Sequence, residues 1–375
     1  MKRDRKKAFR IVFGVIIALV WSGLLFCAME VYERVRWRRI QISNEFVLEE
    51  QSKHARFTQA FSDSLWEDPW STYKKNQEVT FDFNGKRFQI KTNNLGLRDH
   101  FVVIPKPKGL FRILCVGGST TVAGWTNETT YPNLLEKRLK DTFPDVSLEV
   151  INCGVSGLNS NSELEKIGDY LALNPDLILE YNAVNDICWL YFPYLEKNTK
   201  GWRRLLRKSR FLNARMNWNL LPGEYAIRTY LENTTIKNLL ALHDAAAVMQ
   251  VPVAFSSFSR PDLKLLNREE REFLECDLQQ TWRGKYVTLE SYCRMVDIYN
   301  RSLRDSCERK GITYIPVAEN HHGGLNYFID ICHGTDEGIE KKVEIIFDYL
   351  KTYLPSRFKT FEMYKSDAYR NKLLP

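Results

Sequence analysis

The stretch FRILCVGGSTTVAGW, residues 111–125, decides the fold of this chain. It begins with a short apolar run of the kind that forms a fully buried strand, and it continues with two glycines, a serine and two threonines. A glycine-rich turn after such a strand usually either cradles a phosphate or presents a nucleophile at the start of a helix. The rest of the chain must supply the partners that distinguish these two functions.

Four further apolar runs follow, and they alternate with helical patterns. Short buried strands that alternate with helices are typical of a parallel sheet covered on both faces. We therefore predict an α/β fold with a doubly wound, flavodoxin-like five-stranded parallel sheet, which binds ligands at the carboxyl ends of its strands. The predicted strands are Arg112–Val116, Leu148–Asn152, Leu177–Tyr181, Pro252–Ser256 and Thr313–Pro316. The predicted helices cover about 131–143, 161–173, 233–249, 289–310 and 335–353.

The N-terminus differs in character from the rest of the chain. Residues 1–10 carry six Lys/Arg, and residues 11–29 contain no charged side chain. As a helix, this apolar stretch would be about 28 Å long, close to the thickness of a bilayer's hydrocarbon core. Phe26 is too large for the small-residue pattern of a signal-peptide cleavage site near Ala28, so we expect an uncleaved transmembrane anchor. The basic flank predicts a single-pass membrane protein with a cytoplasmic N-terminus and an extracytoplasmic main domain.

The charge balance of the chain outside this segment is nearly even. The formal net charge is +8, of which the first ten residues supply +5. The remainder therefore has no general basic field, and we expect no nucleic-acid partner.

Between the anchor and the C-terminus we expect three regions, which are a stalk and β-hairpin over 30–100, a main domain over 101–355, and a basic aromatic tail over 356–375. The hairpin is predicted from Asn84-Gly85 between alternating apolar residues. Within the domain, 187–232 and 259–288 are too long for tight connections and are read as insertions. The basic segment 201–215 is either a solvated helix with one packed edge or an amphipathic element near a membrane or an anionic substrate.

The glycine turn lacks the features of phosphate-binding loops. No Lys-Ser/Thr pair follows the second glycine, and the glycines at 117, 118 and 124 do not fit G-x-G-x-x-G. Ser119 is therefore interpreted as a nucleophile at a helix start. Other predicted strand ends carry Gly157, Asn185, and the pair Asp330 and His333, three residues apart before the last helix.

These four blocks, in this order, resemble the SGNH (GDSL-type) hydrolase superfamily. The segments N-N-L-G-L-R-D and G-G-S-T-T resemble its extended bacterial branch. The resemblance implies a catalytic triad of Ser119, His333 and Asp330, with Ser119 as nucleophile, His333 as base and Asp330 as the group that orients the histidine. It also implies an oxyanion hole made of the Ser119 N–H, the Gly157 N–H and the Asn185 amide.

The chain departs from the family pattern at two positions. Gly118 stands where the namesake motif has Asp, and Ala183 stands where a Gly is common. The methyl group of Ala183 is expected to narrow the oxyanion pocket.

The resemblance and the anchor together predict a membrane-anchored extracytoplasmic serine esterase that hydrolyses acyl or acetyl esters of envelope glycans or lipids. Two alternatives stay open, an O-acyltransferase that uses the same site and a catalytically idle SGNH-like glycan-binding scaffold. No cofactor is expected. No metal is expected either, because the adjacent His321 and His322 would point to opposite sides of a strand. The oligomeric state is left open.

Two of the eight cysteines are expected beside the active site. Cys188 lies three residues after Asn185, and Cys332 lies between Asp330 and His333. A disulfide between Cys188 and Cys332 is one hypothesis, and small buried thiols are the other.

Overall fold

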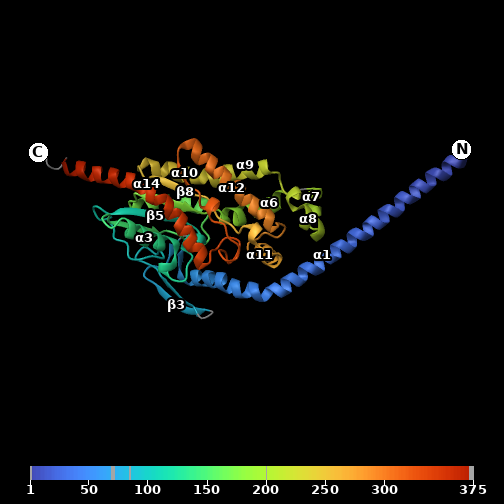
Figure 1. Cartoon of the computed structure of the whole chain (residues 1–375), viewed down its shortest axis with the longest axis horizontal. Coiled ribbons are helices and arrows are strands. Elements are labelled where there is room, and N and C mark those ends of the chain that lie inside the picture. The colour runs from blue at the N-terminus through green and yellow to red at the C-terminus, as the bar shows by residue number, and fades with distance from the viewer. Residues whose placement is uncertain (1, 69–71, 84–85, 200, 371–375) are drawn as a thin grey trace.

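A parallel sheet of five strands lies at the centre of the main domain (Figure 1). The computed structural model describes residues 2–68, 72–83, 86–199 and 201–370. The strands are β5 (Phe111–Gly117), β6 (Leu148–Asn152), β7 (Leu177–Tyr181), β8 (Val253–Ser256) and β9 (Thr313–Ile315), in the spatial order β6-β5-β7-β8-β9. All four pairings are parallel. This confirms the predicted flavodoxin-like sheet and places β5 next to the point where the strand order reverses.

Helices pack on the sheet in two groups. The first group is α3 (Tyr131–Thr142) and the N-terminal part of α14 (Asp336–Arg370), which contact each other. The second group comprises α4 (Ser160–Glu165), α5 (Ile167–Ala172), α10 (Lys237–Val248) and α12 (Leu289–Lys310). The strands have no polar face because helices cover both sides, and every residue of β5 is buried.

The helix predictions hold with two changes. The helix expected over 161–173 is divided at Lys166 into α4 and α5. The helix expected to end near 353 continues to Arg370 despite Pro355, so most of the predicted tail is helical.

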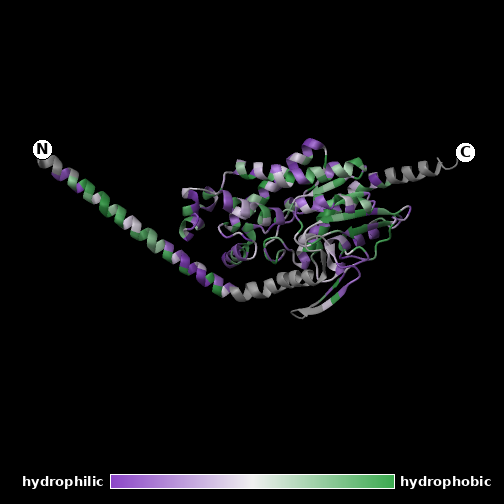
Figure 2. Cartoon of the chain, turned by 180° about the vertical axis from the view of Figure 1, so that it is seen from behind, coloured by the Kyte–Doolittle hydropathy of each residue, from purple (hydrophilic) through white to green (hydrophobic). Residues whose placement is uncertain are grey.

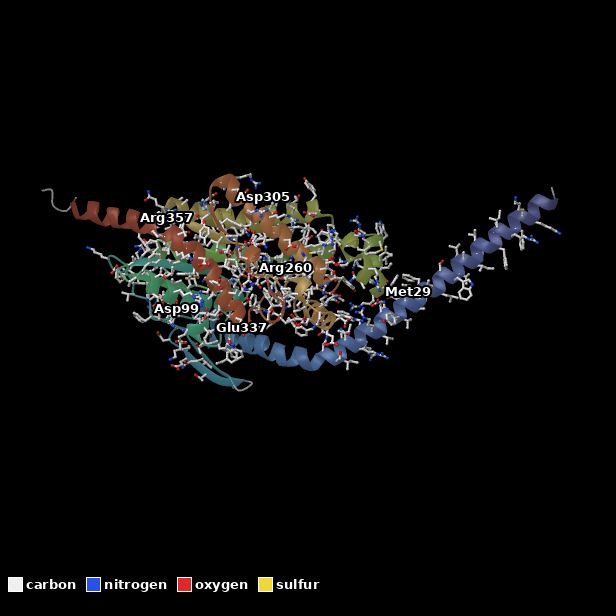
Figure 3. All side chains as sticks on the ribbon, in the orientation of Figure 1. Met29, Asp99, Arg260, Asp305, Glu337 and Arg357 are labelled. Carbon is white, nitrogen blue, oxygen red and sulfur yellow. The ribbon has the colours of Figure 1, made fainter. Side chains whose placement is uncertain are left out.

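Helix α1 (Lys2–Leu65) contains the predicted anchor (Figure 2). Among the described residues it is the one helix long and apolar enough to cross a membrane, by length and composition. In the region expected to form a stalk, α1 continues without a break to Leu65, and it packs against α8 (Arg210–Leu220) and α11 (Arg268–Gln280). No Gly or Pro occurs between residues 24 and 65 to end the helix. Met29, the last residue of the uncharged stretch, marks where α1 approaches the domain (Figure 3).

The predicted hairpin is present as β3 (Glu78–Phe83) and β4 (Lys86–Lys91), paired antiparallel; its turn, Asn84-Gly85, lies outside the described residues. A smaller antiparallel pair, β1 (Trp66–Asp68) and β2 (Thr72–Tyr73), precedes it. Tyr73 and Ile90 from these pairs pack against Val122, Val155 and Leu158. The hairpin region thus borders the loops that follow β5 and β6.

Both insertions are mainly helical. The first contains a π-helical segment (Asp186–Tyr191), α6 (Phe192–Asn198), α7 (Trp202–Leu206), α8 and α9 (Glu224–Leu231), and a second π-helical segment (Glu232–Ile236) joins α9 to α10. The other insertion contains a 3-10 turn (Leu263–Leu265) and α11. α8 and α11 bring parts of both insertions onto α1.

Candidate active site

Ser119 lies directly beyond the carboxyl end of β5, as the first residue of the short helix α2 (Ser119–Val122). Two glycines let the backbone pass close to the end of β7. A Cβ on Gly117 would stand 2.4 Å from the carbonyl oxygen of Tyr181, and a Cβ on Gly118 would stand 2.6 Å from Nδ2 of Asn185. Any larger residue at these positions would displace the loop that carries Ser119.

Asp330 and His333 lie on a tight turn that leads into α14. One carboxylate oxygen of Asp330 accepts hydrogen bonds from the backbone N–H groups of Cys332 at 2.8 Å and His333 at 2.7 Å. A β-bridge between Phe328 and Gly334 closes the turn. These hydrogen bonds curve the backbone around the Asp330 carboxylate. The His333 side chain, three residues later, therefore lies against the same carboxylate.

The structure brings Ser119, His333 and Asp330 into one hydrogen-bonded chain. His333 Nδ1 lies 2.6 Å from Asp330 Oδ2, and His333 Nε2 lies 2.8 Å from Ser119 Oγ. With Asp330 ionised, Nδ1 donates its proton to the carboxylate, so Nε2 is left to accept the Ser119 hydroxyl proton. This arrangement can activate a serine hydroxyl.

The electrostatics of the pair favour an ionised acid beside the imidazole. Burial by itself raises the pKa of Asp330, but the charge of His333 and the hydrogen bonds to the carboxylate outweigh it, and the net pKa is lowered. For His333, burial lowers the pKa, and the charge and hydrogen bond of Asp330 reverse this, so that the net pKa is raised. The site therefore stabilises the imidazolium that forms when the histidine takes a proton.

The three predicted oxyanion donors surround this loop. Asn185 Nδ2 lies beside Gly118 and donates one hydrogen bond to the Leu158 carbonyl at 2.7 Å, which leaves its second proton available. Gly157 has φ of +83°, in the left-handed region that favours glycine. Within the described part of the chain, neither the Ser119 N–H nor the Gly157 N–H donates to another group. Their assignment as an oxyanion hole stays a prediction.

Side chains at the end of β7 hold the Gly157 loop in place. Asn182 Nδ2 also donates to the Leu158 carbonyl at 2.7 Å. Asp186 accepts from the backbone N–H and the hydroxyl of Ser160, at 3.0 and 2.6 Å. The block that contains Asn185 thus fixes the backbone of the neighbouring loop as well as offering an amide.

Arg98 supports the site. It belongs to the segment N-N-L-G-L-R-D, but the sequence alone assigned this arginine no role. Arg98 is fully buried and donates to the carbonyl oxygens of Val122 at 2.7 Å and Gly124 at 2.8 Å. It thereby holds the last residue of α2 and the loop that follows this helix. A buried arginine beside a glycine-rich loop is explained by the need to satisfy the loop's carbonyl groups.

A wall beside His333 comes from the insertion over 259–288. The Trp282 ring centroid lies 5.6 Å from that of His333, and Trp282 Nε1 donates to Asp277 at 3.0 Å. Burial, with the nearby charge of Asp330, raises the pKa of Asp277 to about 7. The Arg283 guanidinium lies 4.2 Å from the ring centroid of Trp189, so the two insertions meet here. Sequence reasoning identified the insertions but not these side chains.

The hypothesis of a disulfide between Cys188 and Cys332 is wrong, since both are free thiols. The Cys332 sulfur instead lies 3.7 Å from Nδ1 of His333. Burial raises the pKa of each thiol well above its ordinary value, which keeps both protonated and unreactive.

The histidine and acid groups do not suit a metal ion. Asp330, Cys332 and His333 have potential ligand atoms close together, but the Asp330 oxygen and His333 Nδ1 bind each other and Nε2 faces Ser119. The Nε2 atoms of His321 and His322 lie 2.8 and 2.7 Å from the backbone carbonyl oxygens of Gly338 and Glu319. These rings support local structure.

No protein-family model matches the sequence, and neither does any curated protein. Solved structures show a similar arrangement over about two thirds of the chain. One is a lipolytic protein of the G-D-S-L family from Desulfitobacterium hafniense, at 10% identity, a TM-score of 0.39, and coverage of 63% of this chain and 98% of that one. Another is a catalytic mutant of an acetylxylan esterase from Geobacillus stearothermophilus, at 13% identity, a TM-score of 0.41, and coverage of 64% and 93%.

A third is an alpha/beta hydrolase enzyme from the metagenome of Lake Arreo, at 16% identity, a TM-score of 0.39, and coverage of 64% and 94%. The first of these three proteins is described as a member of the group that the sequence motifs resemble. At these identities and scores the similarities assign neither a family nor an activity, so the chemistry of the site rests on its own geometry.

Proposed function

We propose that this chain is a membrane-anchored serine esterase that acts through an acyl-Ser119 intermediate. The observation that carries the proposal is the continuous hydrogen-bonded chain from Asp330 through His333 to Ser119, with Ser119 at the start of a helix. A scaffold that only binds a polymer has no use for a serine, a histidine and an acid at these distances.

The geometry supports a two-step reaction. His333 Nε2 takes the proton of Ser119 as its oxygen attacks the ester carbonyl, and the resulting oxyanion is stabilised by the N–H groups of Ser119 and Gly157 and by the Asn185 amide. His333 then gives its proton to the departing alcohol, leaving an acyl ester on Ser119. In the second step His333 takes a proton from water, which attacks the acyl ester, and the acid is released as Ser119 regains its proton.

The substrate class and location follow from the anchor. The uncharged stretch of α1 holds the domain at a membrane, and the excess of basic residues before it favours a cytoplasmic N-terminus and an extracytoplasmic site. Substrates at such a site would be acyl or acetyl esters on envelope glycans or lipids. A sugar hydroxyl that replaces water in the second step would turn the same chemistry into acyl transfer.

The test uses the full chain in detergent micelles. Wild type should be labelled by a fluorophosphonate probe and should hydrolyse p-nitrophenyl acetate. Ser119→Ala should lose the labelling and at least about 10³-fold in hydrolysis. Ser43→Ala, an exposed serine on α1, is the matched control and should behave as wild type.

Absence of labelling and of turnover above Ser119→Ala would overturn the esterase and favour the idle binding module. Release of p-nitrophenol only when a sugar acceptor is present, with the acetyl group recovered on the sugar and not as free acetate, would favour the transferase.

A further inference from the structure

The domain is attached to α1 immediately after the uncharged stretch. The carboxylate of Glu30 accepts hydrogen bonds from the Ser209 hydroxyl at 2.6 Å and from the backbone N–H groups of Arg210 at 3.1 Å and Phe211 at 3.0 Å. It therefore caps the first turn of α8. The rings of Phe26 and Phe211 lie edge to face with centroids 6.0 Å apart. The first turn of α8 is thus fixed to the point where the proposed anchor ends.

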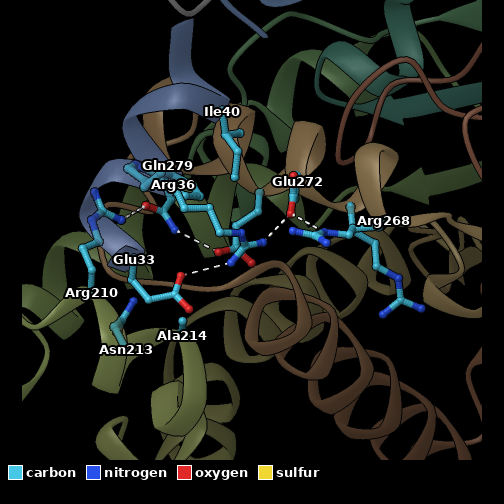
Figure 4. Close-up of a pocket in the computed structure, with 12 residues that line it drawn as sticks. Glu33, Arg36, Ile40, Arg210, Asn213, Ala214, Arg268, Glu272 and Gln279 are labelled. Atoms are coloured by element: carbon cyan, nitrogen blue, oxygen red, sulfur yellow. Dashed lines mark hydrogen bonds and ion pairs between the residues drawn. The ribbon is translucent and has the colours of Figure 1, made fainter. Parts of the chain in front are cut away.

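A second set of contacts fixes the domain around the helix axis (Figure 4). Arg36 pairs with Glu33 at 3.0 Å and with Glu272 on α11. The Arg210 guanidinium lies 4.7 Å from the ring centroid of Trp37 and donates to Gln279 at 2.8 Å. A cavity of about 380 Å³ lies among these residues, and none of the residues that line it belongs to the loop that carries Ser119. Because its arginines and glutamates largely pair with each other, it is part of the docking interface.

Helix α7 precedes this attachment point and carries exposed apolar and basic side chains. Trp202 is 61% exposed and Leu205 is 68% exposed. Arg203, Arg204 and Lys208 form no ion pair with any acid in the described ranges. Figure 1 places α7 and α8 at the end of the domain from which the N-terminal half of α1 projects. The Arg203 guanidinium lies 5.6 Å from the ring centroid of Trp202. Exposed Trp and Leu beside cations that have no acidic partner suit the headgroup layer of a bilayer.

We infer that α7 lies in the interfacial layer of the membrane crossed by α1, with Trp202 and Leu205 inserted at headgroup level and Arg203, Arg204 and Lys208 against anionic lipid headgroups. This rests on the membrane anchor of the proposed function. Glu30 is the first charged residue after the apolar stretch, so the membrane boundary lies near it, and Ser209 touches Glu30. Trp202 comes shortly before Ser209 in the chain, a separation of about two helical turns, so it lies near the same boundary. Together with the anchor, this second contact holds the domain in one orientation at the membrane.

The experiment uses the full chain in phosphatidylcholine nanodiscs with and without phosphatidylglycerol. In a Cys27→Ser background the remaining cysteines are buried, so a nitroxide can be placed at Leu205→Cys. Val248→Cys on α10, 82% exposed, is the matched solvent control, and Val20→Cys within the apolar stretch is the lipid control. Collision with oxygen reports contact with lipid, and collision with a water-soluble nickel chelate reports contact with solvent.

We expect the label at 205 to fall between the labels at 20 and 248, with more oxygen collision and less nickel collision than the label at 248. A label at 205 that behaves like the label at 248, while the label at 20 stays in lipid, overturns the inference alone. Protection of 205 from both reagents would also overturn it and indicate a protein partner. A label at 20 in water would remove the anchor and the inference together.

The charges have a test of their own. Phosphatidylglycerol should increase oxygen collision at 205 in the wild-type background. Replacing Arg203→Gln, Arg204→Gln and Lys208→Gln together should abolish that increase. It should leave the value in pure phosphatidylcholine unchanged. An undiminished response to anionic lipid would contradict the role of these cations.

Discussion

His333 can act as a base toward Ser119 only while Asp330 holds its Nδ1 proton. The 2.6 Å contact between Nδ1 and the acid fixes the ring and its tautomer. Asp330 also outweighs the burial that would otherwise lower the pKa of His333. At the scale of single residues, the reactivity of Ser119 therefore depends on an acid that does not touch it.

Replacing Asp330→Asn should lower kcat/KM for p-nitrophenyl acetate by about 10³–10⁴-fold, because an amide cannot hold the same tautomer. The wild type needs neutral His333, so its activity should rise with pH through a histidine pKa above the ordinary 6.5. In the variant, burial lowers the pKa of His333 without the opposing charge of Asp330. The increase of residual activity with pH should therefore begin at a lower pH. A pH profile of the two proteins checks this, and an unshifted profile would contradict the electrostatic role of Asp330.

Gly118 gives a second prediction at this scale. Replacing Gly118→Ala would place a Cβ 2.6 Å from Asn185 Nδ2 and 3.1 Å from the Leu158 carbonyl oxygen. Displacement of the amide should cost about 10²-fold in kcat. Gly168→Ala is the matched control, because a Cβ there meets nothing within 4 Å, and it should keep full activity. Full activity in Gly118→Ala would exclude Asn185 from the site.

At the scale of elements, α14 carries His333's turn at its start and ties it to α2. Lys342 on α14 is buried, donates to the Thr120 carbonyl at 2.8 Å, and lies 4.6 Å from the ring centroids of both Tyr131 and Tyr181. Thr120 directly follows Ser119. One ammonium group thus joins the last helix, the nucleophile loop and β7, while burial lowers its pKa to about 7.

Lys342→Met should remove a pH dependence of stability. The folded-state pKa of about 7 lies below the ordinary 10.5, so the lysine's contribution is full above 10.5 and is lost as pH falls toward 7. The free energy of unfolding of wild type relative to Lys342→Met should therefore rise from about pH 7 to pH 10. Thermal or urea unfolding in micelles at several pH values measures this difference.

The same variant has a catalytic readout. The charge of Lys342 lowers the pKa of His333, so its removal should move the rise of activity to higher pH. Parallel stability curves would contradict a lowered pKa for Lys342, and an unmoved activity profile would contradict an effect of its charge on His333.

At the scale of the whole molecule, α1 is both a candidate anchor and part of the domain's packing. Ile40 of α1 belongs to the main hydrophobic core, and Glu30 and Arg36 bind elements from the two insertions. These contacts fix the orientation of the main domain relative to α1.

Local patterns in the chain were sufficient for the sheet, for most helices and for the four blocks that carry Ser119, Gly157, Asn185 and the Asp330–His333 turn. Buried strands, apolar helix faces and glycine turns are encoded by residues that are close in sequence. The carboxyl ends of successive parallel strands then meet at one edge of the sheet. The same local reading identified an uncharged stretch of membrane length, because hydropathy and length require no knowledge of packing.

Only the packed molecule decided which side chains meet across long separations. Local sequence could not reveal that Lys342 binds Thr120, that Trp282 stacks beside His333, that Cys188 and Cys332 stay thiols, or that α1 docks on α8 and α11. Each of these contacts joins elements whose distance in space is set by the whole fold. The motifs identified Ser119, His333 and Asp330, whereas the side chains packed around them and the docking of α1 arise from tertiary contacts that no local pattern encodes.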